Sequence, residues 1–221
     1  MKDFEEQRAQ MVFHLQQSGA AHSPEILNAF SRVKRENFFS PEFLQYAYAD
    51  DAFSIGLGQT ISQPTTIAIM LELLQVREGE KVLEVGSGSG YVCALLAHLA
   101  GPSGKVFGVE WLKELFDNAQ RNLLAEKITG VELKQGDGGE GWKEKAPFDC
   151  ILVSCACPFV PKPLIEQLKE GGRIVAPVGD RASQQMQIVE KKDGKPFKRA
   201  PEIGLYEWFT FVPLMGKNGF K

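Results

Sequence analysis

The sequence predicts an α/β fold in which helices cover an open, doubly wound and mostly parallel sheet. From residue 81 onward, short apolar runs alternate with segments of helical periodicity, which is typical of parallel sheets with helices on both faces. A glycine-rich loop at 86–90 separates the first apolar run from the first helix of this part. Residues 1–75 are largely helical in pattern, and we expect them to form an N-terminal helical cap over the ligand edge of the sheet.

The composition indicates one globular domain. The chain has 221 residues, of which 43% are hydrophobic and 24% are charged, and this suits a soluble domain with a sizeable core. No internal repeat or low-complexity linker divides it. We therefore expect a single domain over 1–221, with the cap at 1–75 and the sheet and C-terminal strands at 76–221.

Several classes of protein are disfavoured by the composition. No apolar run approaches the roughly 20 residues of a membrane span, and the charged N-terminus lacks a signal-peptide core. A net charge of −3, with basic residues gathered only at 191–199, argues against nucleic acid. The four cysteines lie in apolar patterns that suit a reducing compartment, and Cys155 and Cys157 lack the spacing and the histidines of a metal site. We expect a cytoplasmic protein without a metal ion.

Periodicity predicts three helices in the N-terminal part. The first covers 5–17, and the second begins at Ser23, an N-cap followed by proline, and runs to Val33. The third covers 63–74, where apolar residues recur at helical spacing.

The alternating part predicts the sheet and its helices. The expected strands are 81–85, 105–109, 131–135, 149–154 and 173–178, and the expected helices are 90–99, 111–124 and 161–168. Two further strands are expected at 185–190 and 208–212, with a turn at 191–194 after the first of them.

The glycine loop predicts a ligand with nucleotide-like parts. The dinucleotide fingerprint G-x-G-x-x-G/A fits neither register, because the sixth position is Tyr91 when counted from Gly86 and Cys93 when counted from Gly88. The phosphate-binding loop G-x-x-x-x-G-K-S/T is also absent. The strand before the loop ends with the carboxylate of Glu84, which repels a pyrophosphate but accepts hydrogen bonds from an ammonium group.

These features fit S-adenosylmethionine, which carries an ammonium group, a ribose diol and a sulfonium cation but no phosphate. Residues 84–90, EVGSGSG, resemble the first motif of class I S-adenosylmethionine-dependent methyltransferases, which have a Rossmann-like fold. The alternative is a tight strand-to-helix turn that binds nothing.

Two further motifs fall at the ends of later strands. Glu110 lies 20 residues beyond Gly90, where such folds place the acceptor for the ribose hydroxyls, although it could equally supply the charge at the start of helix 111–124. Asp137 and Gly138 follow the third strand, and a Gly-Asp-Gly segment is often only a turn. All three motifs lie at the carboxyl ends of parallel strands, where ligands bind in open sheets.

A second motif narrows the resemblance to one family. Residues 58–64 read GQTISQP, and with the glycine loop and the segments 137–138, 146–149 and 167–179 they closely resemble protein-L-isoaspartate O-methyltransferases. The resemblance runs from about Arg32 to Leu214. The GQTISQP segment is specific to this family, whereas the glycine loop identifies only the larger class.

The resemblance implies repair of aged proteins. Members of the family transfer a methyl group from S-adenosylmethionine to the free α-carboxylate of L-isoaspartyl residues, and S-adenosylhomocysteine is the second product. The expected partners are isoaspartyl proteins and peptides, and we expect a monomer. Two alternatives stay open: a related methyltransferase that acts on a different carboxylate, and a module that binds the cofactor without catalysis.

Matching the family motifs residue by residue predicts the site. The expected cofactor-binding residues are Thr60, Ile61, Ser62, Glu84, Gly86, Gly88, Glu110, Asp137, Gly138 and Gln185. Ser62 is also the expected catalytic residue, with a hydroxyl that orients the substrate carboxylate. The alternative is that Ser62 only caps the helix that follows it.

Three details of the predicted pocket stay open. Some family members have a histidine where this chain has Thr65, and some have a threonine where it has Met215. Aromatic residues are dense between 38 and 53. They are typical of a packed core, although one or two could face a peptide or the sulfonium.

Overall fold

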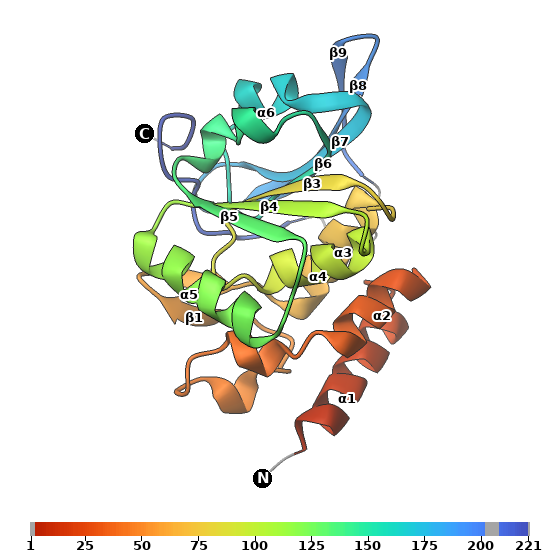
Figure 1. Ribbon diagram of the computed structural model, residues 1–221, viewed down its shortest axis with the longest axis vertical. Coiled ribbons are helices and arrows are strands. Elements are labelled where there is room, and N and C mark those ends of the chain that lie inside the picture. The colour runs from red at the N-terminus through yellow and green to blue at the C-terminus, as the bar shows by residue number, and fades with distance from the viewer. Residues whose placement is uncertain (1–2, 202–207, 221) are drawn as a thin grey trace.

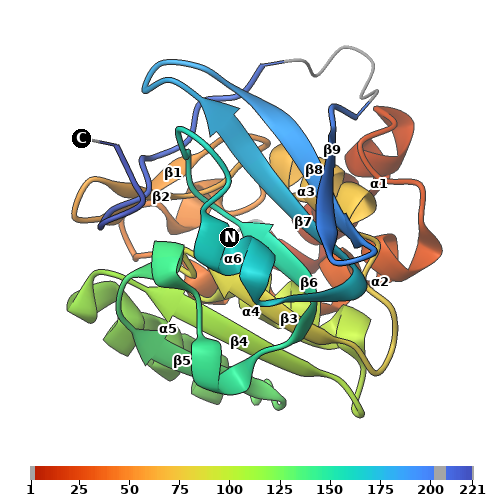
Figure 2. The same ribbon diagram turned by 90° about the horizontal axis from the view of Figure 1, so that it is seen from above.

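A single sheet forms the centre of the molecule. Within residues 3–201 and 208–220, which this computed structural model describes, seven strands pair in the order β5-β4-β3-β6-β7-β8-β9 (Figure 2). The strands β5, β4, β3, β6 and β7 run parallel to one another, and β8 and β9 join antiparallel at one edge. This confirms the mostly parallel, doubly wound sheet that the sequence predicts. The strands are β3 Lys81–Val85, β4 Lys105–Glu110, β5 Val131–Gln135, β6 Phe148–Val153, β7 Leu168–Gly179, β8 Gln184–Lys192 and β9 Lys195–Arg199.

Helices lie on both faces of the sheet (Figure 1). They are α1 Phe4–Gln17, α2 Pro24–Arg32, α3 Pro64–Leu74, α4 Tyr91–Ala100, α5 Lys113–Ala125 and α6 Lys162–Glu166. Helices α3, α4 and α5 cover one face, and the short α6 covers the other. No helix in the part of the chain described by the structure is long and apolar enough to cross a bilayer.

Each face of the sheet has its own apolar core. Alternate residues of a strand point to opposite faces, so Val82 belongs to the core beneath α3 and α4 while Leu83 belongs to the core beneath α6. Both residues are fully buried, because strand β3 lies in the middle of a sheet covered on both sides. This explains the nearly continuous apolar run at 81–85.

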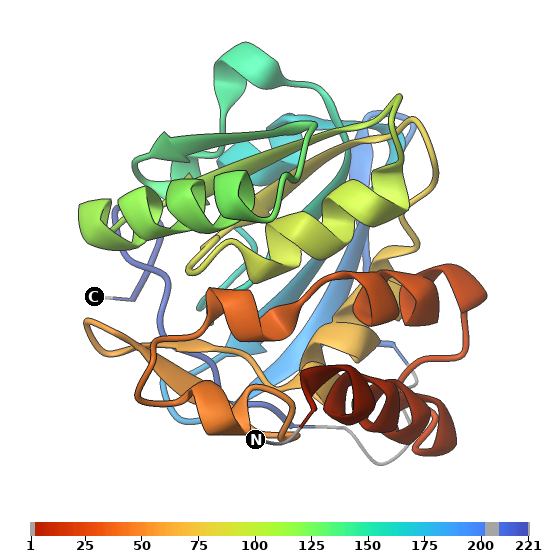
Figure 3. The same cartoon turned by 60° about the horizontal axis from the view of Figure 1, so that its bottom comes forward.

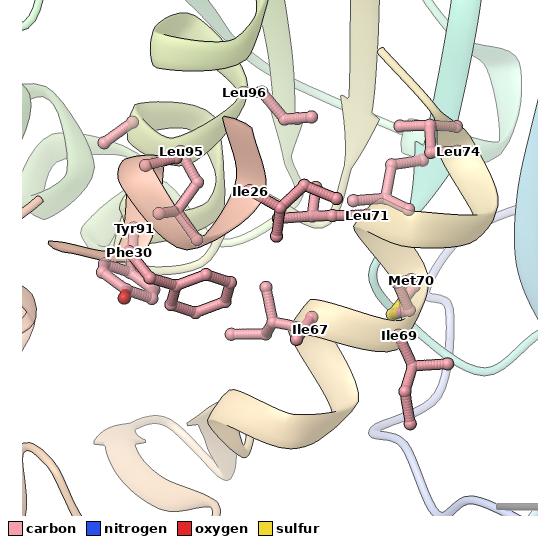
Figure 4. Close-up of a cluster of buried hydrophobic side chains, with 14 of the residues drawn as sticks. Ile26, Phe30, Ile67, Ile69, Met70, Leu71, Leu74, Tyr91, Leu95 and Leu96 are labelled. Atoms are coloured by element: carbon pink, nitrogen blue, oxygen red, sulfur yellow. The ribbon is translucent and has the colours of Figure 1, made fainter. Parts of the chain in front are cut away.

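The N-terminal helices dock on the helical layer rather than directly on the sheet. Figure 4 shows Ile26 and Phe30 of α2 packed with residues of α3 and with Tyr91 and Leu95 of α4. The first residues of α2 are also tied to α3, because the Glu72 carboxylate accepts hydrogen bonds from the Ser23 amide and hydroxyl at 2.7 and 2.6 Å. Serine at the N-cap therefore bonds to a neighbouring helix instead of capping its own.

The segment between α2 and α3 reaches the ligand edge of the sheet. It contains two short 3-10 helices, Arg35–Phe38 and Leu44–Tyr46, and a hairpin of β1 Phe53–Gly56 and β2 Gln59–Ile61. In Figure 3 this orange segment lies beside the red N-terminal helices and extends toward the dark blue C-terminal segment. This hairpin was not predicted from the sequence.

Four expected elements differ in the structure. The strand expected at 173–178 is part of the longer β7, which begins at Leu168. The helix expected at 161–168 ends at Glu166, because Leu168 already pairs with Phe148 in the sheet. No strand forms at 208–212: the Phe209 backbone exchanges both hydrogen bonds with Gln184, but the Phe211 amide bonds to the Gln184 side chain instead. The turn expected at 191–194 narrows to Asp193 and Gly194, because β8 runs to Lys192 and a further strand, β9, follows.

Candidate functional site

A cleft opens at the carboxyl ends of the parallel strands. It lies beside β3, where the chain order of the strands reverses direction, and this is the usual position of a ligand site in an open α/β sheet. The hairpin, four strand ends and the C-terminal segment all contribute to it. Its lining residues are Ile55, Gln59, Thr60, Val85, Gly86, Gly88, Val109, Glu110, Trp111, Leu112, Leu115, Gly138, Ser154, Cys155, Val212, Pro213, Leu214 and Met215.

The glycine loop forms the floor of this cleft. Gly86 and Gly88 adopt the left-handed backbone conformation, with φ of 84° and 51°, which glycine adopts without steric cost. A Cβ atom at Gly88 would lie 3.2 Å from Cδ1 of Ile55, so the hairpin is packed directly against the loop. The loop thus leaves main-chain atoms rather than side chains facing a ligand.

Glu110 joins the glycine loop to the start of α5. Its carboxylate accepts hydrogen bonds from the Gly88 amide at 2.8 Å and from the Leu112 amide at 2.9 Å. The side chain is 6% exposed and lines the cleft. The two roles considered for Glu110, at the start of a helix and in the ligand cleft, therefore coexist in one side chain.

Glu84 lies beneath the cleft rather than in its lining. It is fully buried and accepts hydrogen bonds from the Cys93 thiol at 2.9 Å and from the Ser154 hydroxyl at 2.8 Å. Burial raises the pKa of the Glu84 carboxyl to about 7, although both hydrogen bonds act in the opposite direction. Its contact with the cleft passes through Ser154, which does line it.

Asp137 anchors the C-terminal segment. Its carboxylate accepts hydrogen bonds from the amides of Gly139 and Lys217, each at 2.8 Å. The next residue must be small, because a Cβ atom at Gly138 would lie 2.5 Å from Cγ1 of Val85. We call residues 213–218 the C-terminal strap, since they are fastened to this turn while Pro213, Leu214 and Met215 line the cleft.

The three residues of the signature segment point in different directions. Thr60 is exposed and lines the cleft, whereas Ile61 is 5% exposed and belongs to the apolar core. Ser62 is half-buried, and its carbonyl accepts a hydrogen bond from Arg35 at 2.8 Å. Its hydroxyl makes no hydrogen bond with any residue that the structure describes.

Another side chain performs the capping considered for Ser62. Helix α3 begins at Pro64, and the Asp50 carboxylate accepts hydrogen bonds from the Thr65 amide at 2.9 Å and the Thr65 hydroxyl at 2.8 Å. A carboxylate at a helix N-terminus is favourable for both hydrogen bonding and the helix dipole. The hydroxyl of Ser62 is therefore not used by the helix.

Gln185 is not brought to the cleft. It is exposed on β8, opposite Val178, and it is not among the lining residues. The neighbouring Gln184 is fully buried and holds the C-terminal segment, because its side chain accepts a hydrogen bond from the Phe211 amide and donates one to the Asp180 carbonyl.

Some lining residues were not predicted from the sequence. Trp111 directly follows Glu110, and that adjacency was the available signal for it. Leu115 lies one helical turn later on α5. Met215 was already a detail of the predicted pocket, but no local pattern marks Cys155 or the rest of the strap, because the tertiary fold alone brings them to the strand ends.

The fold and the cleft define a class of protein, the S-adenosylmethionine-dependent methyltransferases. The sequence profile of the protein-L-isoaspartate(D-aspartate) O-methyltransferase family matches residues 6–219 of this chain. The chain belongs to that family.

Relatives agree with this assignment. A protein-L-isoaspartate O-methyltransferase of Methanopyrus kandleri is 43% identical over 224 residues, which cover 100% of this chain and 96% of the relative. A solved structure described as a protein-L-isoaspartate O-methyltransferase has a TM-score of 0.84 at 30% identity, covering 96% of this chain and 66% of that one. A Plasmodium falciparum structure in complex with S-adenosyl-L-homocysteine shares the fold, with a TM-score of 0.81 at 24% identity, covering 93% of this chain and 97% of that one.

The activity follows from the family. The chain is a protein-L-isoaspartate O-methyltransferase that uses S-adenosylmethionine and acts on isoaspartyl proteins in protein repair. The cleft suits such a cofactor chemically, because it combines a backbone-lined glycine loop, the buried Glu110 carboxylate and apolar walls.

Proposed function

We propose that Ser62 orients the isoaspartyl carboxylate and that no protein base takes part in methyl transfer. A carboxylate with a pKa near 4 is ionised at neutral pH, so its oxygen needs no deprotonation before it attacks. S-adenosylmethionine, when bound, supplies a methyl group on a sulfonium cation. Because opposite charges cancel during the reaction, alignment and exclusion of water provide most of the gain, and alignment alone contributes about 7–11 kcal/mol in well-oriented systems.

One observation carries this proposal: within the described part of the chain the Ser62 hydroxyl has no hydrogen-bond partner, although the main chain on both sides of it is bound by side chains. Asp50 caps the following helix, Arg35 binds the Ser62 carbonyl, and Thr60 two residues earlier lines the cleft. A half-buried hydroxyl in this position is available to donate a hydrogen bond to a carboxylate.

The cofactor residues are proposed in two groups. Thr60, Gly86, Gly88, Glu110 and Gly138 line the cleft and would contact the cofactor, with Glu110 accepting hydrogen bonds from the ribose hydroxyls. Glu84 and Asp137 would support these contacts through Ser154 and the strap. The remaining three expected residues, Ile61, Ser62 and Gln185, are not among the residues that line the cleft, so any role they have in cofactor binding would be indirect.

We also propose that the protein acts as a monomer in the cytoplasm, without a nucleic-acid partner. The net charge is −3, and the four cysteines are free and buried, which suits a reducing compartment and disfavours nucleic acid. Light scattering during gel filtration tests the oligomeric state directly, and a mass of two or more chains would contradict it.

Kinetics of Ser62→Ala test the role of the hydroxyl. We expect kcat/KM on an isoaspartyl peptide to fall about 10- to 100-fold, the effect of one hydrogen bond to a charged group. The matched control is Ser31→Ala on the exposed part of α2, which should stay near wild type. Near-wild-type kinetics with a lowered Tm would instead make Ser62 a structural residue. The aspartyl twin of the peptide and other carboxylates, assayed in parallel, test the alternative substrate class.

A further inference from the structure

Arg35 is a fully buried cation that bonds to main-chain carbonyls rather than to a carboxylate. Its side chain is fully buried, and its guanidinium carbon lies 4.8 Å from the ring centre of Tyr91 and 5.3 Å from that of Phe39. Within the residues that the structure describes, it forms no ion pair, and its Nη1 has no hydrogen-bond partner. Burial lowers the pKa of the Arg35 guanidinium, and Tyr91, Tyr48 and Asp50 offset only part of this effect. Keeping a guanidinium at this position is therefore costly to the fold.

The hydrogen bonds of Arg35 indicate what it does. Its Nε donates to the Ala47 carbonyl at 2.9 Å, and its Nη2 donates to the Ser62 carbonyl at 2.8 Å. Two parts of the main chain that are distant in sequence are thus joined through one flat, rigid group. Lysine cannot reproduce this arrangement, because its ammonium is a point charge on a flexible stem.

The main chain is held equally firmly after Ser62. Asp50 accepts hydrogen bonds from the Gln63 side chain at 3.1 Å and from the Thr65 amide at 2.9 Å. Arg35 on one side and Asp50 on the other therefore leave the backbone of Ser62 little freedom, although neither side chain forms a hydrogen bond with its hydroxyl.

We propose that Arg35 is a positioning residue for methyl transfer, which fixes the Ser62 main chain and so directs the Ser62 hydroxyl toward the substrate carboxylate. This inference rests on the role proposed above for Ser62. Its physical basis is that misplacement of a reacting group by about 1 Å costs on the order of 100-fold in rate.

Arg35→Lys is the central variant, because it keeps the charge and loses the geometry. The number of intact sites is first counted by calorimetry with S-adenosylhomocysteine. We expect kcat/KM on an isoaspartyl peptide, divided by this number of sites, to fall about tenfold or more. The loss should fall mainly on kcat, and the affinity for S-adenosylhomocysteine should stay within about twofold. Counting active sites by calorimetry separates this effect from simple misfolding.

Arg173→Lys, on β7, is a matched control, because Arg173 binds the main chain at the last residue of α3, while Arg35 binds it just before α3 begins. Arg173 also bonds to a main-chain carbonyl, that of Leu74 at 3.0 Å, and its Nε likewise has no partner in the described part of the chain. The control should lower Tm while leaving the rate per site within about twofold of wild type. Equal per-site rates for the two lysine variants would overturn the proposal, whatever the Ser62 variant does.

A double-mutant cycle decides whether Arg35 acts through Ser62. The variant with both Arg35→Lys and Ser62→Ala should be no slower than the slower single variant. If the losses of kcat/KM in the two single variants multiply in the double variant, Arg35 acts independently of Ser62 and the inference is contradicted. In that case a slow Ser62→Ala variant would still support the role proposed for Ser62. A normal Ser62→Ala would remove both proposals together.

Asp50→Asn provides a second test if Arg35→Lys yields too little folded protein. This substitution weakens the hydrogen bonds from Thr65, at the start of α3, that help to fix the main chain after Ser62, and it keeps the size of the side chain. A loss of kcat in the same direction, again absent when Ser62 is alanine, is the expected result. An unchanged kcat per site would count against positioning by this segment.

Discussion

Glu110 shows how one side chain links the local structure to ligand affinity. Its carboxylate holds the amides of Gly88 and Leu112 and still lines the cleft. We expect Glu110→Gln to raise the Kd for S-adenosylhomocysteine about 10- to 100-fold, because an anionic acceptor is lost and an amide NH₂ is brought against two backbone donors. Isothermal titration calorimetry measures this directly.

The control for this prediction is Glu114→Gln, four residues further on. Glu114 is exposed in the first turn of α5, so the substitution removes the same charge without touching the cleft. An equal loss of affinity in both variants would show that only the net charge matters and would contradict the specific role of Glu110.

At the scale of elements, the C-terminal strap is the part of the cleft most open to a simple test. Gly216 has φ of 101°, and a Cβ atom there would lie 2.3 Å from Oδ2 of Asp137. Gly216→Ala should therefore break the bond from the Lys217 amide to Asp137 and release the strap. We expect the Kd for S-adenosylhomocysteine to rise about tenfold, because ligand binding must then order the strap again.

A substitution at a second glycine, Gly194, serves as a control that distinguishes release of the strap from the cost of backbone strain. Gly194 has φ of 71° in the β8–β9 turn and open space around its Cβ position. Gly194→Ala carries a similar conformational cost far from the strap, so it should lower Tm without changing the affinity. If both variants bind the ligand like the wild type, the strap makes no contribution to affinity.

At the scale of the whole molecule, Glu84 makes stability depend on pH. Burial raises the pKa of its carboxyl from 4.5 to about 7, so between these values the folded chain keeps a proton that the unfolded chain has released. Its contribution to the free energy of unfolding is thus greatest below pH 4.5 and is lost as the pH rises to 7. The loss is on the order of 3 kcal/mol.

Glu84→Gln should remove this dependence. Denaturant titrations of both proteins between pH 5 and pH 8 give the free energy of unfolding, and the wild type should lose stability relative to the variant as the pH rises. Other titrating groups cancel in this difference. A difference that does not change with pH would mean that Glu84 keeps an ordinary pKa in the folded protein.

Local patterns were sufficient for most of the sheet and its helices. The strands at 81–85 and 131–135 have the predicted bounds, because apolar runs beside glycine turns leave few alternatives. The strand expected at 208–212 failed for a tertiary reason, since the Gln184 side chain replaces a backbone partner. The hairpin before α3 was missed because its strands are only four and three residues long.

The residues of the candidate site likewise fall into those that local patterns predicted and those that depend on tertiary contacts. The glycine loop and Glu110 carry their signal within a few residues, and the structure brings them to one cleft. Gln185 was chosen by resemblance alone, and its strand directs it outward next to the buried Gln184. No role was predicted for Asp50 or Arg35, because the partners that define their roles lie 12 to 27 residues away along the chain.

The sequence by itself determined the family, the class of methyl donor and the parallel sheet, because each depends on short motifs and on periodicity. Only the tertiary structure decided that Glu84 is buried beneath the cleft, that Asp50 rather than Ser62 caps α3, and that Arg35 holds the main chain of Ser62. The physical reason is that burial and hydrogen bonds between distant segments depend on how the whole chain packs, which no local pattern records.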